Sequence, residues 1–177
     1  MDDIVRQAMA KWPNVPDCYG WLGLDARGSW YLRDAATQAA GAFPASKGAK
    51  VEHEKLLAFI ARNYECDARG CWFFQNGPQR VYVELEVTPW IWRIHAEGQV
   101  YAHTGKAFVP TTCWQDEAGR VYLSDSQTLG LVHTQDVGQL ALLLEQGRWP
   151  LHETSFEQLC TQFPVELSPQ AIFGTPN

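Results

Sequence analysis

The sequence lacks the features of several large functional classes. Its 14 Lys and Arg are scattered singly among 20 Asp and Glu, for a net charge of -6, so no basic stripe can neutralise a row of phosphates. Its longest aliphatic run is "LALLL" at 140–144, whereas a membrane span needs about 20 apolar residues. Its first residues, "MDDIVRQAMAKW", are acidic where a signal peptide is positively charged. We therefore expect a cytoplasmic protein with no nucleic-acid partner and no membrane association.

Common catalytic and cofactor fingerprints are also absent. The sequence contains no G-x-x-x-x-G-K-[ST], no G-x-G-x-x-G, no G-x-S-x-G and no H-E-x-x-H. Its five cysteines are an odd number and none has C-x-x-C spacing, unlike a secreted disulfide framework or a zinc site. We therefore predict free thiols, no cofactor and no metal, and we favour a non-enzymatic protein.

The composition is that of an ordinary globular protein. Of 177 residues, 46% are apolar and 19% are charged. A chain of about this length buries roughly 70% of its unfolded surface, so it needs no metal or disulfide to be stable. We therefore interpret 1–177 as a single compact chain.

One short phrase occurs three times, as "LDARGSWYLRD" at 24–34, "CDARGCWFFQN" at 66–76 and "QDEAGRVYLSD" at 115–125. In each copy an Asp stands three residues before a Gly, and a run of β-forming residues follows. Such an Asp begins a turn, the Gly supplies a positive φ, and the run makes a strand, so each copy predicts a β-hairpin. The turn residues are Asp25 with Gly28, Asp67 with Gly70, and Asp116 with Gly119.

The rest of the pattern indicates an α+β fold made of antiparallel hairpins and sheet with packed helices. Helical spacing of apolar residues predicts helices at 2–12, 50–64, 134–146 and 154–163. The Ala- and Gly-rich stretch 35–49 is typical of a loop. A hairpin followed by a helix occurs twice, so we expect an internal repeat with similar halves at 15–88 and 89–150, framed by the terminal helices 2–12 and 154–163.

The aromatic residues around position 90 are the best candidates for a binding surface. Six of the eight tryptophans lie in predicted strands, where they either pack in the core or line a groove. Arg beside aromatic residues recurs at binding hot spots, and a cleft forms where duplicated units meet. We therefore predict a module that binds a small molecule or a protein, with a regulatory role as one interpretation. The predicted site is Trp90, Trp92, Arg93, His95 and Tyr101.

A second interpretation is a small hydrolase or a metal-dependent enzyme that uses polar residues of the later hairpins. Its candidate residues are His95, His103, Cys113, Asp116 and His133. The register of the hairpin "WIWRIHAEGQVYAHTG" bears on this, since a one-residue shift moves every side chain to the other face.

Two registers of that hairpin are open. A two-residue turn at 97–98 pairs Arg93 with Ala102 and sends His95 and His103 to opposite faces. A three-residue loop pairs Arg93 with His103 and puts both histidines on one face. We prefer the first register because it buries more aromatic surface, and it disfavours a metal held by the two histidines.

From "MAKWPNVPDCYGWLGLDARGSWYLRD" through "RNYECDARGCWFFQNGPQRVYVELEVTPW" the chain resembles a family of uncharacterised proteobacterial proteins of about this length. That family has no assigned activity, so the resemblance implies no functional residues. The order of hairpin, helix, hairpin and "VYVELEVTP" is also similar in pattern to a second uncharacterised bacterial family. That likeness implies a fold with repeated motifs, and a role in signal transduction has been suggested for the second family.

Overall fold

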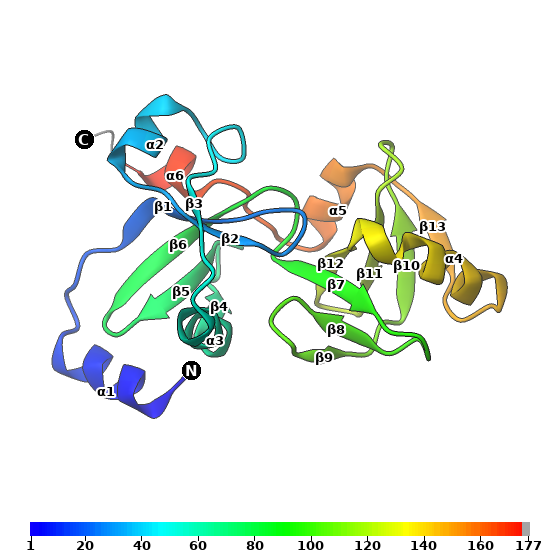
Figure 1. The fold of residues 1–177 in the computed structure, drawn as a ribbon, viewed down its shortest axis with the longest axis horizontal. Helices are drawn as coiled ribbons and strands as arrows, with labels where there is room; N and C mark the ends of the chain where they lie inside the picture. The colour runs from blue at the N-terminus through cyan, green and yellow to red at the C-terminus, as the bar shows by residue number, and fades with distance from the viewer. Residues whose placement is uncertain (175–177) are drawn as a thin grey trace. The chain divides into compact units, whose positions relative to one another are not determined.

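The computed structural model describes residues 1–174 and divides the chain into two units, each with its own β-sheet (Figure 1). Unit 1 consists of Met1–Asp25, Ser29–Glu86 and the described residues from Glu166 onward. Unit 2 consists of Ala26–Gly28 and Val87–Val165. The main division falls between Glu86 and Val87.

Unit 1 contains a six-stranded sheet in the order β3-β2-β1-β6-β5-β4. Its strands are β1 (Cys18–Leu24), β2 (Trp30–Leu32), β3 (Ala49–Lys50), β4 (Tyr64–Cys66), β5 (Trp72–Asn76) and β6 (Gln79–Leu85). Its helices are α1 (Asp3–Lys11), α2 (Ala35–Ala40), α3 (Glu54–Arg62) and α6 (Pro169–Phe173). The sheet and α3 meet through apolar side chains, among them Ile60 of α3, which is fully buried.

Unit 2 contains a seven-stranded sheet in the order β13-β10-β11-β12-β7-β8-β9, curled into a half-barrel. Its strands are β7 (Trp90–Ile94), β8 (Val100–Ala102), β9 (Ala107–Phe108), β10 (Thr112–Gln115), β11 (Val121–Ser124), β12 (Leu129–Val132) and β13 (Leu151–Glu153). Its helices are the 3-10 turn η1 (Thr134–Asp136), α4 (Val137–Glu145) and α5 (Phe156–Gln162). Leu159 and Phe163 pack with Ile91 and Tyr122 in its core.

The fold class is α+β, as predicted, and hairpins make most of both sheets. Eight of the strand pairings are antiparallel, but three are parallel: β1 with β6, β12 with β7, and β10 with β13. The sequence pattern did not indicate the parallel pairs, because they join strands that are distant in sequence. Each sheet is therefore mixed.

The stretch 35–49, expected to be a loop, contains helix α2. Asp34 accepts a hydrogen bond from the backbone N–H of Thr37 at 2.8 Å and so caps this helix. The segment that follows is held by Arg33, whose guanidinium is buried and donates to the backbone carbonyls of Gly41 and Ser46. Tertiary hydrogen bonds, which local composition does not reveal, therefore order this segment.

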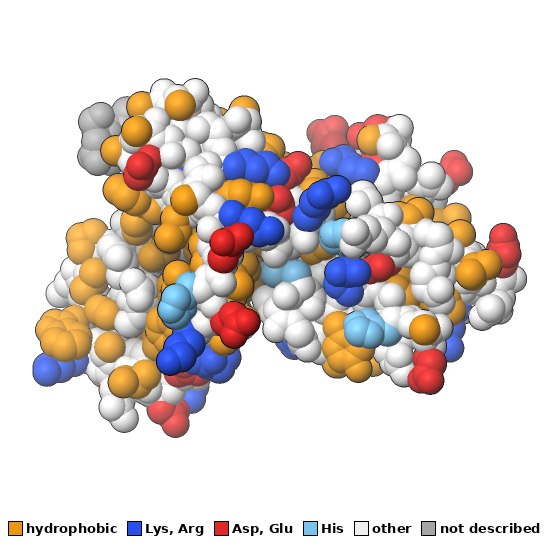
Figure 2. Space-filling model, in the orientation of Figure 1, with side chains coloured by type: hydrophobic (Ala, Val, Ile, Leu, Met, Phe, Trp, Pro, Cys, Tyr) orange, Lys and Arg blue, Asp and Glu red, His pale blue; other side chains and the backbone are white. Residues whose placement is uncertain are grey.

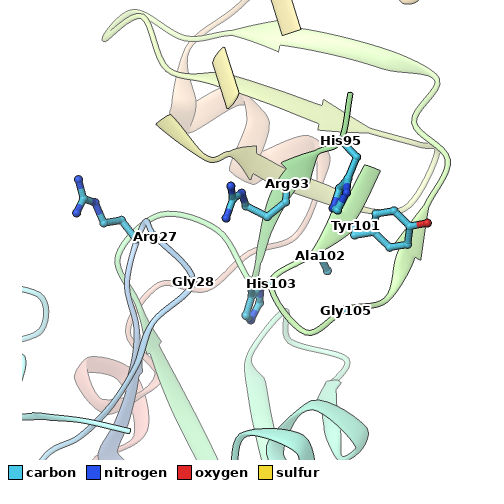
Figure 3. Close-up of a pocket in the computed structure, with 8 residues that line it drawn as sticks. All are labelled: Arg27, Gly28, Arg93, His95, Tyr101, Ala102, His103 and Gly105. Carbon is cyan, nitrogen blue, oxygen red and sulfur yellow. The ribbon is translucent and has the colours of Figure 1, made fainter. Parts of the chain in front are cut away.

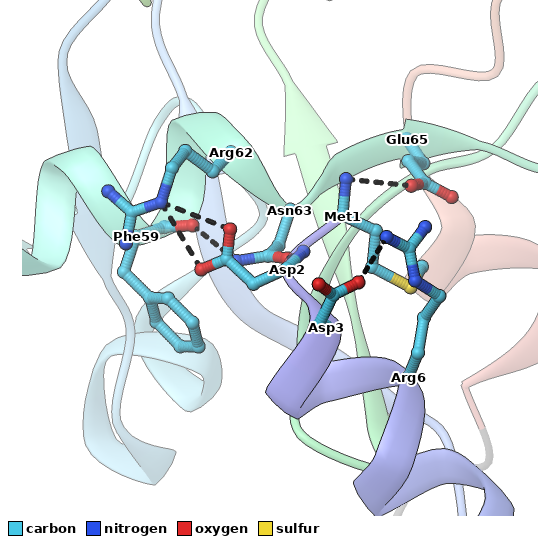
Figure 4. A network of polar contacts seen from close by, with 8 residues as sticks. All are labelled: Met1, Asp2, Asp3, Arg6, Phe59, Arg62, Asn63 and Glu65. Carbon is cyan, nitrogen blue, oxygen red and sulfur yellow. Dashed lines mark hydrogen bonds and ion pairs between the residues drawn. The ribbon is translucent and has the colours of Figure 1, made fainter.

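Helix α1 is attached to the end of α3 by a polar network (Figure 4). Nε of Arg62 lies 3.2 Å from both carboxylate oxygens of Asp2, and the backbone N–H of Asp2 donates to Oδ1 of Asn63 at 2.8 Å. Asn63 is fully buried and also donates to the carbonyl of Phe59. The predicted helix 2–12 is thus present and is part of unit 1.

Within residues 1–174, no helix is long and apolar enough to cross a membrane.

Candidate functional site: a pocket built from hairpin turns

Five hairpin turns share one backbone geometry. In each, the N–H of the first residue donates to the carbonyl of the residue four positions on, with N···O distances of 2.8 to 3.0 Å. The first residues are Asp25, Asp67, His95, Ala102 and Asp116. The fourth residues are Gly28, Gly70, Gly98, Gly105 and Gly119, with φ between +75° and +84°. The positive φ expected at three of these glycines is confirmed, and two further turns of the same kind are found.

In the three turns that begin with Asp, which we call the Asp-led turns (25–29, 67–71 and 116–120), the carboxylate stabilises the turn. One oxygen accepts the backbone N–H of the residue four positions on, at 2.8 to 3.1 Å. The other accepts a Tyr hydroxyl at 2.7 to 3.1 Å and contacts a cation at 2.6 to 3.2 Å. The hydroxyls belong to Tyr31, Tyr82 and Tyr122, and the cations to Lys47, Arg69 and Arg120.

The middle Asp-led turn receives its hydroxyl from a different position. In the other two turns it comes from the sixth residue after the Asp, but here that residue is Phe73. Tyr82 pairs with Phe73 across β5 and β6 and donates to Asp67 at 3.1 Å instead. A neighbouring strand therefore supplies the hydroxyl that the turn's own strand lacks.

Asp116 illustrates the electrostatics of these turns. Burial alone would raise the pKa of this carboxyl, but hydrogen bonds from Tyr122 and Arg120 outweigh burial and lower its pKa. Burial and the hydrogen bond to Asp116 in turn raise the pKa of Tyr122. Asp116 is therefore ionised and fully engaged in holding its own turn.

The other two turns, which we call the pocket turns (95–99 and 102–106), have no carboxylate at the first position. The imidazole of His95 instead contacts the ring of Tyr101, six residues on, with the centroids 5.0 Å apart. Both turns line a cavity of about 450 Å³ in unit 2. Its lining residues are Arg27, Gly28, Arg93, His95, Tyr101, Ala102, His103 and Gly105 (Figure 3).

Strand register places the polar lining residues together. Arg93 of β7 pairs with Tyr101 of β8, and His95 lies two residues beyond Arg93, so the three share one face of the hairpin. In Figure 3 the guanidinium of Arg93 points toward the turn that carries Arg27 and Gly28. The guanidinium of Arg27 points away from Arg93. Figure 2 shows basic and histidine side chains on the surface over β7 and β8.

Arg93 is held in place from one side. Its Nε donates to Oδ2 of Asp136 at 2.6 Å, and its Nη2 lies 3.3 Å from Oδ1. Oδ2 also accepts the backbone N–H of Ile94 at 3.1 Å. Burial would raise the pKa of Asp136, but these contacts lower it. The Arg93 side chain remains 45% exposed, so part of its donor fork faces solvent.

Neither Arg93 pairing considered for this hairpin is observed, although the three-residue loop of the second register is present and His95 and His103 lie on one face, as that register predicted. Arg93 pairs with Tyr101, not with Ala102 or His103, because the loop of 96–98 closes with a hydrogen bond from His95 to Gln99. A glycine with positive φ at the third loop position permits this tighter pairing.

Trp90 and Trp92 are core residues and do not line the pocket. They are 8% and 2% exposed, and their rings stack on each other at 6.0 Å. Trp92 also stacks on Phe108 at 4.1 Å and donates to the carbonyl of Leu123 at 2.9 Å. The groove predicted from these two tryptophans is therefore wrong, while Arg93, His95 and Tyr101 of the same set do line a pocket.

The residues considered for an enzyme are not gathered into one set. His103 shares the pocket with His95, but Cys113 and Asp116 are not among the lining residues. His133 is buried and its Nδ1 accepts the N–H of Gln135 at 3.1 Å. Among residues 1–174, no three His, Cys, Asp or Glu side chains are placed to hold a metal ion. All five cysteines are free thiols.

Sequence reasoning missed Arg27, Gly28, Ala102 and Gly105 as lining residues. A signal for the pocket turns was present, because all five turns carry an aromatic residue three positions after the glycine. These aromatic residues are Tyr31, Phe73, Tyr101, Phe108 and Tyr122. A search that required Asp at the first position could not find the two turns that lack it.

Comparison with known proteins gives a family and a fold. No curated protein matches the chain. A DUF1285 family protein from Silicibacter pomeroyi DSS-3 is similar in structure, with 12% identity, a TM-score of 0.51, and coverage of 81% of this chain and 85% of that one. A second DUF1285 family protein, from Shewanella baltica OS155, has 14% identity over 68% of this chain and 90% of that one, but its TM-score of 0.42 supports no conclusion.

The first likeness shows a shared fold and no more. The family model described as "Protein of unknown function (DUF2946)" matches residues 1–173. The chain therefore belongs to this family of proteins of unknown function.

Proposed function

We propose that the protein is a non-enzymatic binding protein whose unit 2 pocket takes a small anion bearing a carboxylate or a phosphate. One observation supports this most directly. Both turns that lack the Asp of the other three line this pocket, where they are joined by Arg27 and Gly28 of the first Asp-led turn. The lining as a whole contains two arginines and two histidines and no carboxylate.

The chemistry of Arg93 suits such a ligand. A guanidinium presents its donors in a planar fork that matches two oxygens of a carboxylate or phosphate. Asp136 holds one edge of the fork in a fixed position, which reduces the entropy lost when the other edge binds a ligand. The imidazole of His95 adds a donor on the same face, whereas the Tyr101 hydroxyl points away from Arg93 in Figure 3.

The pocket turns lack the stabilising carboxylate of the other turns, and this also supports a binding role. An Asp at position 95 would accept the N–H of Gln99 and the hydroxyl of Tyr101, as its counterparts do in the Asp-led turns. Positions where a sequence departs from its own stabilising pattern are commonly functional. His95 is such a position.

Binding is favoured over hydrolysis by the composition of the lining. The enzyme hypothesis required His95 or His103 to meet Cys113 or Asp116 in one pocket. Cys113 is fully buried outside the lining, and Asp116 is engaged by Tyr122 and Arg120. We therefore assign the pocket a recognition role.

The experiment is a thermal-shift screen of inorganic phosphate, pyrophosphate, citrate and succinate, followed by calorimetric titration of the best anion. We expect Arg93→Ala to weaken binding at least tenfold, and higher salt to weaken binding to the wild type. Arg69→Ala is the matched control. Arg69 pairs with Asp67 much as Arg93 pairs with Asp136, and both arginine side chains are 45% exposed, but Arg69 is outside the pocket.

Arg69→Ala should lose a similar ion pair and keep its affinity for the anion. Equal affinity of Arg93→Ala and the wild type would contradict the proposal. Binding only of uncharged compounds at this pocket would contradict it as well.

A further inference from the structure

Unit 1 contains a second pocket with different chemistry. It has a volume of about 410 Å³ and lies where β1, β2, β5 and β6 meet α3. Its walls are mainly apolar and include Trp21, Leu22, Leu32, Leu56, Ile60 and Phe74. Pockets of roughly 300–1,000 Å³ with such linings are typical small-molecule sites.

A bulge in β1 presents Trp21 to this pocket. Cys18 pairs with Val81 and Leu22 with Val83, so β1 has two more residues than β6 over this span. Successive residues of a regular strand point to opposite faces, but Trp21 and Leu22 both line the pocket.

Gly20 makes this bulge possible. Its φ is +80°, and a Cβ at this position would lie 2.3 Å from the side chain of Gln170. The bulge leaves the indole of Trp21 46% exposed. Bulges of this kind often re-aim a side chain at a functional site.

The charged residues of the lining are already engaged by the protein. Arg33 is 1% exposed and its guanidinium donates to carbonyl oxygens. These carbonyls belong to Gly20, Gly41 and Ser46, at 2.7 to 3.0 Å. Asp34 accepts hydrogen bonds from the N–H and the hydroxyl of Thr37, both at 2.8 Å. The pocket therefore offers little to a charged ligand, in contrast to the pocket of unit 2.

We infer that the unit 1 pocket binds an uncharged small molecule with an aromatic or compact aliphatic body, stacked on Trp21 and packed against Leu32 and Ile60. Burying apolar ligand surface supplies the affinity, at roughly 25 cal/mol per Å² before the costs of association. An indole face adds offset stacking with a flat ring. A helix with its side chains is about 10–12 Å wide, which is too broad for a cavity of this volume.

The probe for this site is N-phenyl-1-naphthylamine, an uncharged fluorophore whose emission rises in apolar surroundings. We expect saturable binding to the wild type with one site per chain. Leu32→Glu should weaken binding at least tenfold, because it places a carboxylate in the apolar wall. Leu151→Glu is the matched control, since both are strand leucines, 48% and 47% exposed, and Leu151 does not line this pocket.

A second variant, Asn76→Trp, tests the same site without adding charge. Asn76 is exposed at the pocket, so a bulky ring there narrows the entrance and should also weaken the probe. Circular dichroism melting checks that each variant is folded. Absence of saturable binding to the wild type would overturn the inference. So would equal weakening by Leu32→Glu and Leu151→Glu, or full affinity in both folded pocket variants.

Discussion

The Asp-led turns and the pocket turns have the same backbone and different first residues. All five place a glycine at φ between +75° and +84° and close with the same backbone hydrogen bond. In three of them a buried or half-buried carboxylate also engages a Tyr hydroxyl and a cation. The turn therefore forms with or without a carboxylate, and in the Asp-led turns the carboxylate adds hydrogen bonds that the pocket turns lack.

The largest expected effect comes from removing a carboxylate. Asp116→Ala should lower the free energy of unfolding by about 2–3 kcal/mol, because the fully buried hydroxyl of Tyr122 loses its acceptor. Urea unfolding at neutral pH measures this. Tyr122→Phe in the Asp116→Ala background should cost little more, since the two groups act as a pair. A loss below about 0.5 kcal/mol would show that the carboxylate is not stabilising.

The same pair predicts a pH dependence. The pKa of Asp116 is lowered in the folded protein, so its stabilisation is complete above the unfolded pKa of about 3.9. It is lost as the pH falls through the folded pKa. The stability difference between the wild type and Asp116→Ala should therefore be constant above about pH 5 and narrow below about pH 4. A difference that widens in acid would contradict the assignment.

A smaller loss of stability is expected when a turn glycine is replaced, and it should differ between two glycines with similar φ. Gly119→Ala should cost about 1 kcal/mol from backbone strain alone, because the nearest side-chain atom is 3.9 Å from the added Cβ. Gly28→Ala should cost more, because its Cβ would lie 2.6 Å from Cβ of His103. It should also weaken anion binding at the unit 2 pocket, whereas Gly119→Ala should not. Equal losses of stability would mean that His103 moves aside for the added Cβ at little energetic cost.

The smallest expected change in stability is an increase. His95→Asp restores the carboxylate to a pocket turn, with Tyr101 at the spacing that donates to Asp25 and Asp116. Stability should rise by about 0.5–1 kcal/mol, and anion binding should be lost because the lining gains a negative charge. His95→Ala is the control, and we expect it to weaken binding without raising the melting temperature. A destabilised His95→Asp protein would show that the pocket turn cannot accommodate the carboxylate.

Much of the fold could be predicted because its signals are local. The Asp and Gly of each repeated phrase were identified correctly as turn residues, since φ and the first hydrogen bonds depend only on neighbouring residues. Helices α1, α3, α4 and α5 were likewise predicted from the spacing of apolar residues. The stretch containing α2 was missed because Arg33 and Asp34, outside the Ala-rich run, order it.

The candidate site could be predicted only in part. Arg93, His95 and Tyr101 were named because Arg and aromatic residues stand close together there, and all three line the pocket. Trp90 and Trp92 were named for the same reason and lie in the core. Local sequence shows that residues are neighbours, but the strand register decides which of them face solvent.

The sequence by itself determined the turns, the strands that flank them and the α+β class, because each follows from steric and hydrogen-bonding preferences within a few residues. Only the tertiary structure decided the three parallel strand pairs, the register of the β7–β8 hairpin and the burial of the tryptophans. The register follows from the three-residue loop 96–98, and the other two depend on contacts between segments far apart in the chain. The two pockets depend on the same contacts, because each is lined by side chains from several such segments.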